Sequence, residues 1–235
     1  MGLKRKPPAN NVRRVAAIGN NSRSTIRNKN GATVQCESFG GERKLTLCFE
    51  RDPTVRDYQS QPLRIPYVDS EGKRHTYVPD FKVWKTDGSI EIHEVTRSER
   101  RHLPNAQRRE KAAREYCDKE GWRYVVHTED SDSLPNDTMT SNLFELYMFR
   151  PNVYSRLDLA VTVREKLNNG RRLSLPLLIK DISQELELPV GVVAPGLYHM
   201  LWHGKLETDL HSLIFIDGAP LPKTLVWLPV KEVNS

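Results

Sequence analysis

The chain has 235 residues, with 36 Lys and Arg against 30 Asp and Glu, which gives a formal net charge of +6. Hydrophobic residues make up 37% of it, and no apolar run approaches the ~20 residues that a membrane-spanning helix needs. The three cysteines stand far apart without a CxxC pair, which argues against a zinc site and a disulfide framework. We therefore expect a cytoplasmic protein with no membrane partner.

The N-terminal segment is strongly basic. Residues 1–30 carry eight Lys and Arg and no acidic residue, and they are rich in Asn, Ser and Pro. We expect this segment to be a flexible arm. Basic arms bind nucleic-acid backbones by releasing counterions, so Arg13 and Arg14 are candidate DNA contacts. The alternative is a solvated tail that only keeps the protein soluble.

The next part of the chain predicts an α/β domain. A helix is expected over residues 42–50, because apolar residues recur at helical spacing there. A hairpin is expected over 61–84, followed by a strand over 89–96 after the Asp-Gly turn.

A second helix is expected over 105–120, between Pro104 and Gly121, and a short strand over 122–128. This order predicts a mixed sheet flanked by helices, and we assign the domain to residues 31–150.

Residues 151–235 differ in character. Three helices are expected over 154–168, 175–188 and 190–204, and two short strands follow them. Three small helices followed by a hairpin predict a winged-helix domain, a variant of the helix-turn-helix. The domain carries nine basic and nine acidic residues, a balance that favours a protein partner at least as much as DNA.

Two acidic residues stand in neighbouring predicted strands. Asp80 lies in VPDFKVW (78–84) and Glu94 in IEIHEVTR (90–97). If these strands pair, the two carboxylates meet at one end of the sheet. Such a pair is repulsive unless a cation joins it, and Mg²⁺ or Mn²⁺ suits oxygen ligands, with the main-chain carbonyl of Val95 as a further donor. The alternative is that Asp80 caps a turn and Glu94 is a surface residue.

The stretch 36–96 as a whole resembles the TnsA family, the endonuclease subunit of heteromeric cut-and-paste transposases. The matching elements are, in order, Glu37-Ser38, Glu42, Asp52-Pro53 with Val55, Gln61-Pro62, Tyr77-x-Pro79-Asp80-Phe81 and Glu94-Val95. Their combination and order are more specific than any one of them. The resemblance implies a restriction-endonuclease-like (PD-(D/E)xK) mixed sheet followed by a winged-helix domain.

The resemblance also implies metal ligands. Glu42, at the helix acid of the family, would bind Mg²⁺ together with Asp80 and Glu94. Glu37 is the alternative to Glu42 as the helix acid. Mn²⁺ is expected as a possible substitute for Mg²⁺.

Thr96 is the departure from the family, which has a lysine at this position. That lysine polarises the attacking water and stabilises developing negative charge, and a threonine hydroxyl supplies no charge. Three interpretations remain open. A relocated cation replaces it, for which Lys82, Arg97 and Lys111 are candidates; the metals suffice at a reduced rate; or the subunit is inactive.

The segment after the second acid is basic. Residues 97–114 carry seven Lys and Arg against two Glu. A helix here can lie along a DNA backbone and add sequence-independent affinity. The candidate DNA contacts are Arg97, Arg100, Arg101, Arg108 and Lys111. The alternative is a solvated helix face with pairs such as Glu110 with Arg114.

By resemblance, the chain is expected to be a Mg²⁺-dependent DNA endonuclease that hydrolyses the 5′ strand at transposon ends. Its expected partners are double-stranded DNA, an integrase-type (TnsB-like) transposase that cuts the 3′ strand, and an AAA+ (TnsC-like) regulator that engages the C-terminal domain. A bacterial, nucleoid-associated location follows. The alternatives are a stand-alone restriction or repair nuclease and a catalytically inactive DNA-binding scaffold.

Overall fold

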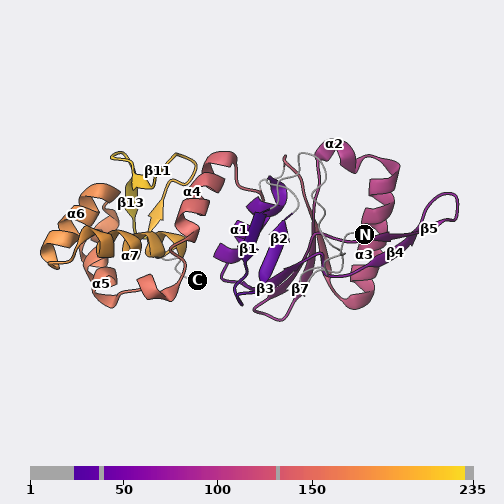
Figure 1. Cartoon of the computed structure of the whole chain (residues 1–235), viewed down its shortest axis with the longest axis horizontal. Helices are drawn as coiled ribbons and strands as arrows, with labels where there is room; N and C mark the ends of the chain where they lie inside the picture. The colour runs from indigo at the N-terminus through magenta and orange to yellow at the C-terminus, as the bar shows by residue number, and fades with distance from the viewer. Residues whose placement is uncertain (1–23, 37–39, 131–132, 231–235) are drawn as a thin grey trace, which may run out of the picture. The chain divides into compact units, whose positions relative to one another are not determined.

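The computed structural model describes residues 24–36, 40–130 and 133–230. The chain divides into two compact units, with the division after Leu134 (Figure 1). Arg13 and Arg14 of the expected arm lie outside the described residues. The last residues of that arm differ from expectation, because Ser24–Arg27 forms strand β1 and pairs with β2 (Thr33–Cys36).

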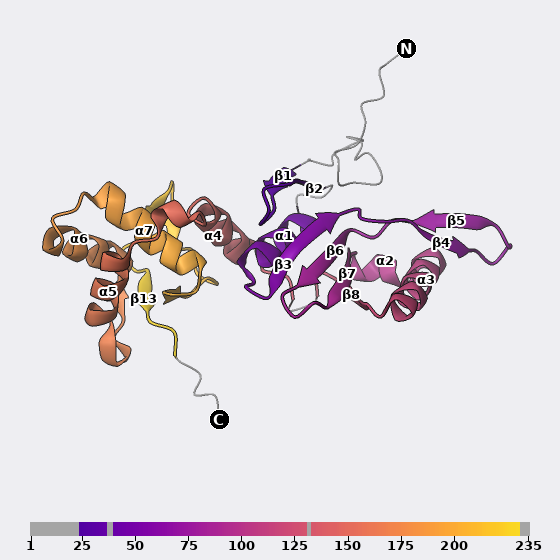
Figure 2. The same cartoon turned by 90° about the horizontal axis from the view of Figure 1, so that it is seen from below.

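A four-stranded mixed sheet forms the centre of the first unit, in the order β3-β6-β7-β8 (Figure 2). Its strands are β3 (Val55–Ser60), β6 (Phe81–Lys85), β7 (Ile90–Val95) and β8 (Arg123–His127). β3, β6 and β7 are antiparallel, whereas β7 and β8 are parallel. A parallel pair needs a crossover connection, which α2 (Ser98–Arg101) and α3 (Pro104–Glu120) provide. The expected mixed sheet flanked by helices is confirmed.

Helices cover both faces of this sheet (Figure 1). On one face, Leu45 and Phe49 of α1 (Gly41–Arg51) pack against buried side chains of β3 and β6. On the other face, Ala113 of α3 packs with Ile65 and Tyr77, and Tyr124 of β8 packs against the same cluster. Successive strand residues point to opposite faces, so neighbouring residues of β7 belong to different environments.

The expected hairpin over 61–84 forms only in part. β4 (Ile65–Val68) and β5 (Arg74–Tyr77) make a separate two-stranded sheet, and β6 starts anew at Phe81. Between them, Pro79 lacks an N–H for a strand ladder, and the Asp80 carbonyl instead accepts a hydrogen bond from the Gln61 N–H at 2.7 Å. The strand β3, which pairs with β6 along its length, was not predicted from the sequence.

Both predicted ends of α3 are confirmed. Pro104 is its first residue, where the missing N–H costs no helical hydrogen bond. Gly121 follows its last residue with φ 70°, the left-handed conformation that glycine adopts without strain.

The second unit contains four α-helices and several short strands. The helices are α4 (Asp137–Tyr147), α5 (Leu157–Lys166), α6 (Leu175–Glu185) and α7 (Val190–Trp202), with 3₁₀ turns at η1 (Asn152–Tyr154) and η2 (Asn168–Gly170). The strands are β9 (Leu173–Ser174), β10 (Glu207–Thr208), β11 (Phe215–Ile216), β12 (Ala219–Pro220) and β13 (Leu225–Trp227). They form a three-stranded sheet, β10-β13-β9, and a β11-β12 pair.

The boundary between the units lies earlier than residue 150, where the sequence placed it. The buried Asn142 of α4 donates to the carbonyls of Leu210 and Ser212 at 2.9 and 2.8 Å. These bonds tie α4 to the second unit. Across the part of the chain that the structure describes, no helix is long and apolar enough to cross a membrane.

Candidate active site

Asp80 and Glu94 meet at one end of the central sheet. Phe81 pairs with His93 across β6 and β7, so the residues one step further, Asp80 and Glu94, lie opposite each other. The Val95 N–H donates to Asp80 Oδ2 at 2.8 Å, which fixes this carboxylate at the strand end. The two predicted strands do pair, and their acids come together as the pattern indicated.

Two phenols surround Glu94 on the α3 face of the sheet. The Tyr77 hydroxyl donates to Glu94 Oε2, and it lies 3.1 Å from the Tyr124 hydroxyl. Burial raises the pKa of Glu94 well above its usual value, and the negative charge of Asp80 raises it further. The Tyr77 hydrogen bond and the nearby Arg109 act in the opposite direction. A bound cation would relieve the repulsion between the two carboxylates.

The chemistry of this donor set fits a magnesium-like ion. Mg²⁺ is held in proteins by one or two carboxylates and keeps several waters, and Asp80 and Glu94 supply such a pair. Within the described ranges, no group of three or more His, Cys, Asp or Glu residues is arranged to hold a metal ion. The described structure therefore gathers two of the three predicted carboxylate ligands.

Glu42 comes from the opposite side of the sheet. It lies in the first turn of α1, next to Gly41, and Gly41 packs so closely on Val95 that a Cβ would overlap Val95 Cγ1. The Val95 side chain points to the face opposite Glu94. A role for Glu42 as a metal ligand stays a prediction, and Glu37 lies outside the described residues.

Lys82 is not placed to replace the missing lysine. Its Nζ lies 3.5 Å from the centroid of the Trp122 ring, and burial lowers its pKa. Glu91 pairs with Arg123, so Trp122 lies level with Ile90, about 13 Å along β7 from Glu94 at ~3.3 Å per residue. This placement speaks against Lys82 as the relocated cation.

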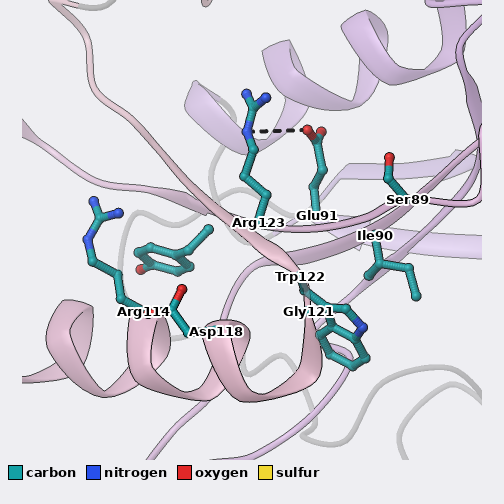
Figure 3. A pocket seen from close by; sticks show the side chains of 9 residues that line it. Ser89, Ile90, Glu91, Arg114, Asp118, Gly121, Trp122 and Arg123 are labelled. Carbon is teal, nitrogen blue, oxygen red and sulfur yellow. Dashed lines mark ion pairs between the residues drawn. The ribbon is translucent and has the colours of Figure 1, made fainter.

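A cavity of about 630 Å³ opens at that far end, between the starts of β7 and β8 and the end of α3 (Figure 3). Glu91 and Arg123 stand side by side among its lining residues, with Arg123 Nε 3.4 Å from Glu91 Oε1. Asp80 and Glu94 do not line this cavity. The carboxylate pair and the cavity are thus separate features of the same sheet.

Thr96 continues the ladder between β7 and β8. Its N–H donates to the His127 carbonyl at 2.9 Å, and its side chain is half-buried. By strand alternation it belongs to the same face as Glu94. The position that carries lysine in the TnsA family therefore lies beside the carboxylates but brings no charge.

The predicted DNA contacts divide into two groups. Arg101 donates from Nε and Nη2 to Glu110 at 3.0 and 2.8 Å, and Arg114 donates to the same carboxylate at 2.7 Å. These bonds hold the pKa of Glu110 at about 2 and tie α2 to α3. The Arg101 guanidinium is therefore already paired with Glu110 within the protein. The predicted Glu110–Arg114 pair is confirmed.

Of the other candidates, Arg97, Arg100 and Lys111 are exposed, whereas Arg108 is half-buried. Arg97 and Lys111 make long, exposed ion pairs with Glu99 and Glu115, and such pairs contribute little to stability. Arg100 is exposed in α2, and Arg108 donates to Asn105 at 3.2 Å. Their role in DNA binding stays a prediction.

Three residues near Glu94 escaped the sequence analysis as functional residues: Tyr77, Tyr124 and Arg109. Tyr77 belongs to the motif that carried the resemblance, but its contact with Glu94 requires the fold. Arg109 stands four residues before the buried Ala113, and its exposed side chain reaches the Tyr77 ring. Helical spacing does not single it out, because Arg108 stands four residues before Ala112, which packs on the same cluster.

A chain of polar side chains centred on the two buried histidines His93 and His127 lies on the α1 face. His93 Nδ1 is 2.8 Å from His127 Nε2, and His127 Nδ1 is 2.7 Å from Ser133 Oγ. His93 Nε2 lies 3.1 Å from Glu91 Oε2. Burial lowers the pKa of His127 to about 4, so this imidazole is neutral near pH 7.

A mixed sheet flanked by helices, with two carboxylates meeting at the ends of its central strands, is consistent with a nuclease domain. Residues 52–129, roughly a third of the chain, match the family model described as TnsA-like endonuclease N terminal. This match supports the assignment of the chain to the TnsA-like endonucleases, as the sequence motif indicated. No curated protein matches the chain.

Proposed function

We propose that the chain is the metal-dependent endonuclease subunit of a heteromeric transposase and hydrolyses the 5′ strand at transposon ends. One observation carries this proposal. Asp80 and Glu94 lie opposite each other at the end of two paired strands, inside the segment that matches the TnsA-like endonucleases.

The proposed reaction is hydrolysis of a phosphodiester. Water adds to phosphorus, and one P–O ester bond breaks to leave an alcohol and a phosphate monoester. Mg²⁺, or Mn²⁺ in its place, held by Asp80 and Glu94 with Glu42 and the Val95 carbonyl as further donors, would activate the water and neutralise charge on the phosphate.

The chain's own contribution is to hold the carboxylates in place. The Val95 N–H orients Asp80, and the Tyr77 hydroxyl orients Glu94. Fixing ligands by partners of this kind commonly decides metal affinity and activity.

Basic residues around the site would hold the DNA. Arg97 and Arg100 follow β7 directly, and Arg108 and Lys111 lie on α3. Together with Arg13 and Arg14 of the N-terminal segment, they would supply sequence-independent contacts to phosphates.

The second unit would serve protein partners. β9 lies between α5 and α6 and pairs with β13, which also pairs with β10, and this order of helices and strands supports a winged-helix domain. We propose that it engages an AAA+ (TnsC-like) regulator, and that an integrase-type (TnsB-like) transposase cuts the 3′ strand. The proposed setting is the bacterial cytoplasm, in association with the nucleoid.

A catalytically inactive scaffold is the second candidate. Thr96 supplies no charge and Lys82 is engaged by Trp122, which favours this alternative. Against it, both carboxylates are present and held by hydrogen bonds.

Nicking of transposon-end DNA by the chain with its cognate transposase distinguishes the two candidates. We expect a nick at the 5′ strand in Mg²⁺ or Mn²⁺, none in EDTA, and loss of the nick in Asp80→Ala. A wild-type chain that binds end DNA but never nicks it would favour the scaffold. Nicking of any DNA without the transposase would favour a stand-alone nuclease.

A further inference from the structure

Arg109 approaches the two carboxylates through an aromatic ring. Its guanidinium carbon lies 5.9 Å from the centroid of the Tyr77 ring, and the hydroxyl of that ring donates to Glu94. The Tyr77 ring therefore lies between the Arg109 guanidinium and Glu94, on the same face of the sheet as Thr96.

The packing of α3 fixes this approach. Ala113, four residues after Arg109, is fully buried against Ile65 and Tyr77. Residues four apart lie on the same face of a helix, and this face brings the exposed Arg109 guanidinium close to the Tyr77 ring beside Glu94.

The neighbouring cations have other partners. Lys82 lies over Trp122, and Arg101 and Arg114 are both bonded to Glu110. Arg109 makes one long hydrogen bond, from Nε to the Asn105 carbonyl at 3.4 Å. Among the residues that the structure describes, no ion pair ties Arg109 to a carboxylate.

We propose that Arg109 supplies the positive charge that the site lacks at Thr96, by binding the attacked DNA phosphate from α3. This inference rests on the nuclease function proposed above. A guanidinium keeps its charge in any environment and donates to phosphate oxygens in a bidentate manner, and the Tyr77 ring offers it a platform. The residue that replaces the lysine therefore comes from a helix and not from the strand.

The test compares Arg109→Ala with Lys119→Ala, a matched loss of one positive charge at an exposed residue in the last turn of the same helix. Single-turnover nicking of end DNA is measured in Mg²⁺ with the cognate transposase, and DNA affinity is measured separately in Ca²⁺. Removing one group that stabilises transition-state charge costs about 10²–10³-fold in rate, so we expect this loss in Arg109→Ala. Its DNA affinity should stay close to that of Lys119→Ala, which should nick at nearly the wild-type rate.

Rescue adds a second readout. Thr96→Lys in the Arg109→Ala background should restore nicking at least about tenfold, because it returns a charge to the family's position. Thermal unfolding of each variant checks that the fold is retained.

Equal nicking by Arg109→Ala and Lys119→Ala would overturn the inference. A rate loss that tracks lost DNA affinity, or one that Thr96→Lys does not restore, would overturn it as well. The proposed nuclease function has its own test, and it would be contradicted if Asp80→Asn nicked DNA at the wild-type rate. A wild-type chain that does not nick would remove both proposals.

Discussion

The close contact between Gly41 and Val95 predicts the effect of a single added methyl group. Gly41 opens α1, and a Cβ at this position would overlap Val95 Cγ1, which is far inside the ~3.5 Å of normal carbon contact. In Gly41→Ala, either α1 or Val95 must therefore move. Movement of Val95 would disturb Asp80, because the Val95 N–H donates to the Asp80 carboxylate. Movement of α1 would displace Glu42, the predicted third ligand, because it follows Gly41.

The expected magnitude follows from two opposing terms. Overpacking of a packed interior costs about 1–3 kcal/mol. Alanine gains up to about 1 kcal/mol over glycine in a helix, and less at its first residue. We expect Gly41→Ala to lower the free energy of unfolding by about 1–2 kcal/mol. If the start of α1 moves with Glu42, nicking should fall by about 10–100-fold, since small misplacements of reacting groups are costly.

Urea unfolding followed by tryptophan fluorescence measures the first effect, and single-turnover nicking measures the second. Gly191→Ala is the matched control, because Gly191 also lies near a helix start and a Cβ there meets nothing within 4 Å. It should be neutral or stabilising. Adding Val95→Ala to Gly41→Ala removes the overlapping methyl group and should recover part of the lost stability. Equal unfolding midpoints for Gly41→Ala and Gly191→Ala would refute the steric argument.

Three further predictions concern pH, Lys82 and α4. The pKa of His127 is about 4 in the folded chain and about 6.5 in the unfolded one, so the unfolded chain binds more protons between these values. The free energy of unfolding, measured with urea, should therefore fall by at most about 3 kcal/mol as pH drops from 6.5 to 4. This fall should be smaller in His127→Gln, and an equally steep fall in that variant would contradict the prediction. Lys82→Met should nick at nearly the wild-type rate, and it should lose about 1 kcal/mol of stability because the contact with the Trp122 ring is lost. A hundredfold slower nicking rate would instead identify Lys82 as the cation that replaces the missing lysine. Asn142→Ala should cost about 3 kcal/mol in urea unfolding, since it removes two buried hydrogen bonds and one part-buried hydrogen bond. The exposed Ser141→Ala should change stability by less than about 0.5 kcal/mol, and equal effects would show that α4 is not anchored to the second unit.

Local chemistry made parts of this fold predictable. Pro104 and Gly121 bound α3 because each acts within its own turn of the chain. Asp80 and Glu94 could be brought together because strand alternation and one turn suffice to place them. These features need only short-range rules.

Long-range contacts made other parts unpredictable. Strand alternation predicts the face to which Lys82 belongs. It does not predict that the Lys82 ammonium lies over the ring of Trp122, which comes forty residues later in the sequence. The same limit hid Arg109, since its partner Tyr77 lies on a different element. β3 escaped notice because its pairing with β6, and not its own composition, makes it a strand.

Asp80→Asn tests the central claim most directly. An asparagine can still accept the Val95 N–H, so the substitution keeps the hydrogen bond seen at 2.8 Å and removes only the charge. Single-turnover nicking of transposon-end DNA should be measured in Mg²⁺ with the cognate transposase. We expect Asp80→Asn to unfold at nearly the wild-type midpoint and to nick at least about 10²-fold more slowly, since a rise of ~2.7 kcal/mol in the activation barrier suffices for that. Nicking at the wild-type rate by this variant would contradict the assignment of the site.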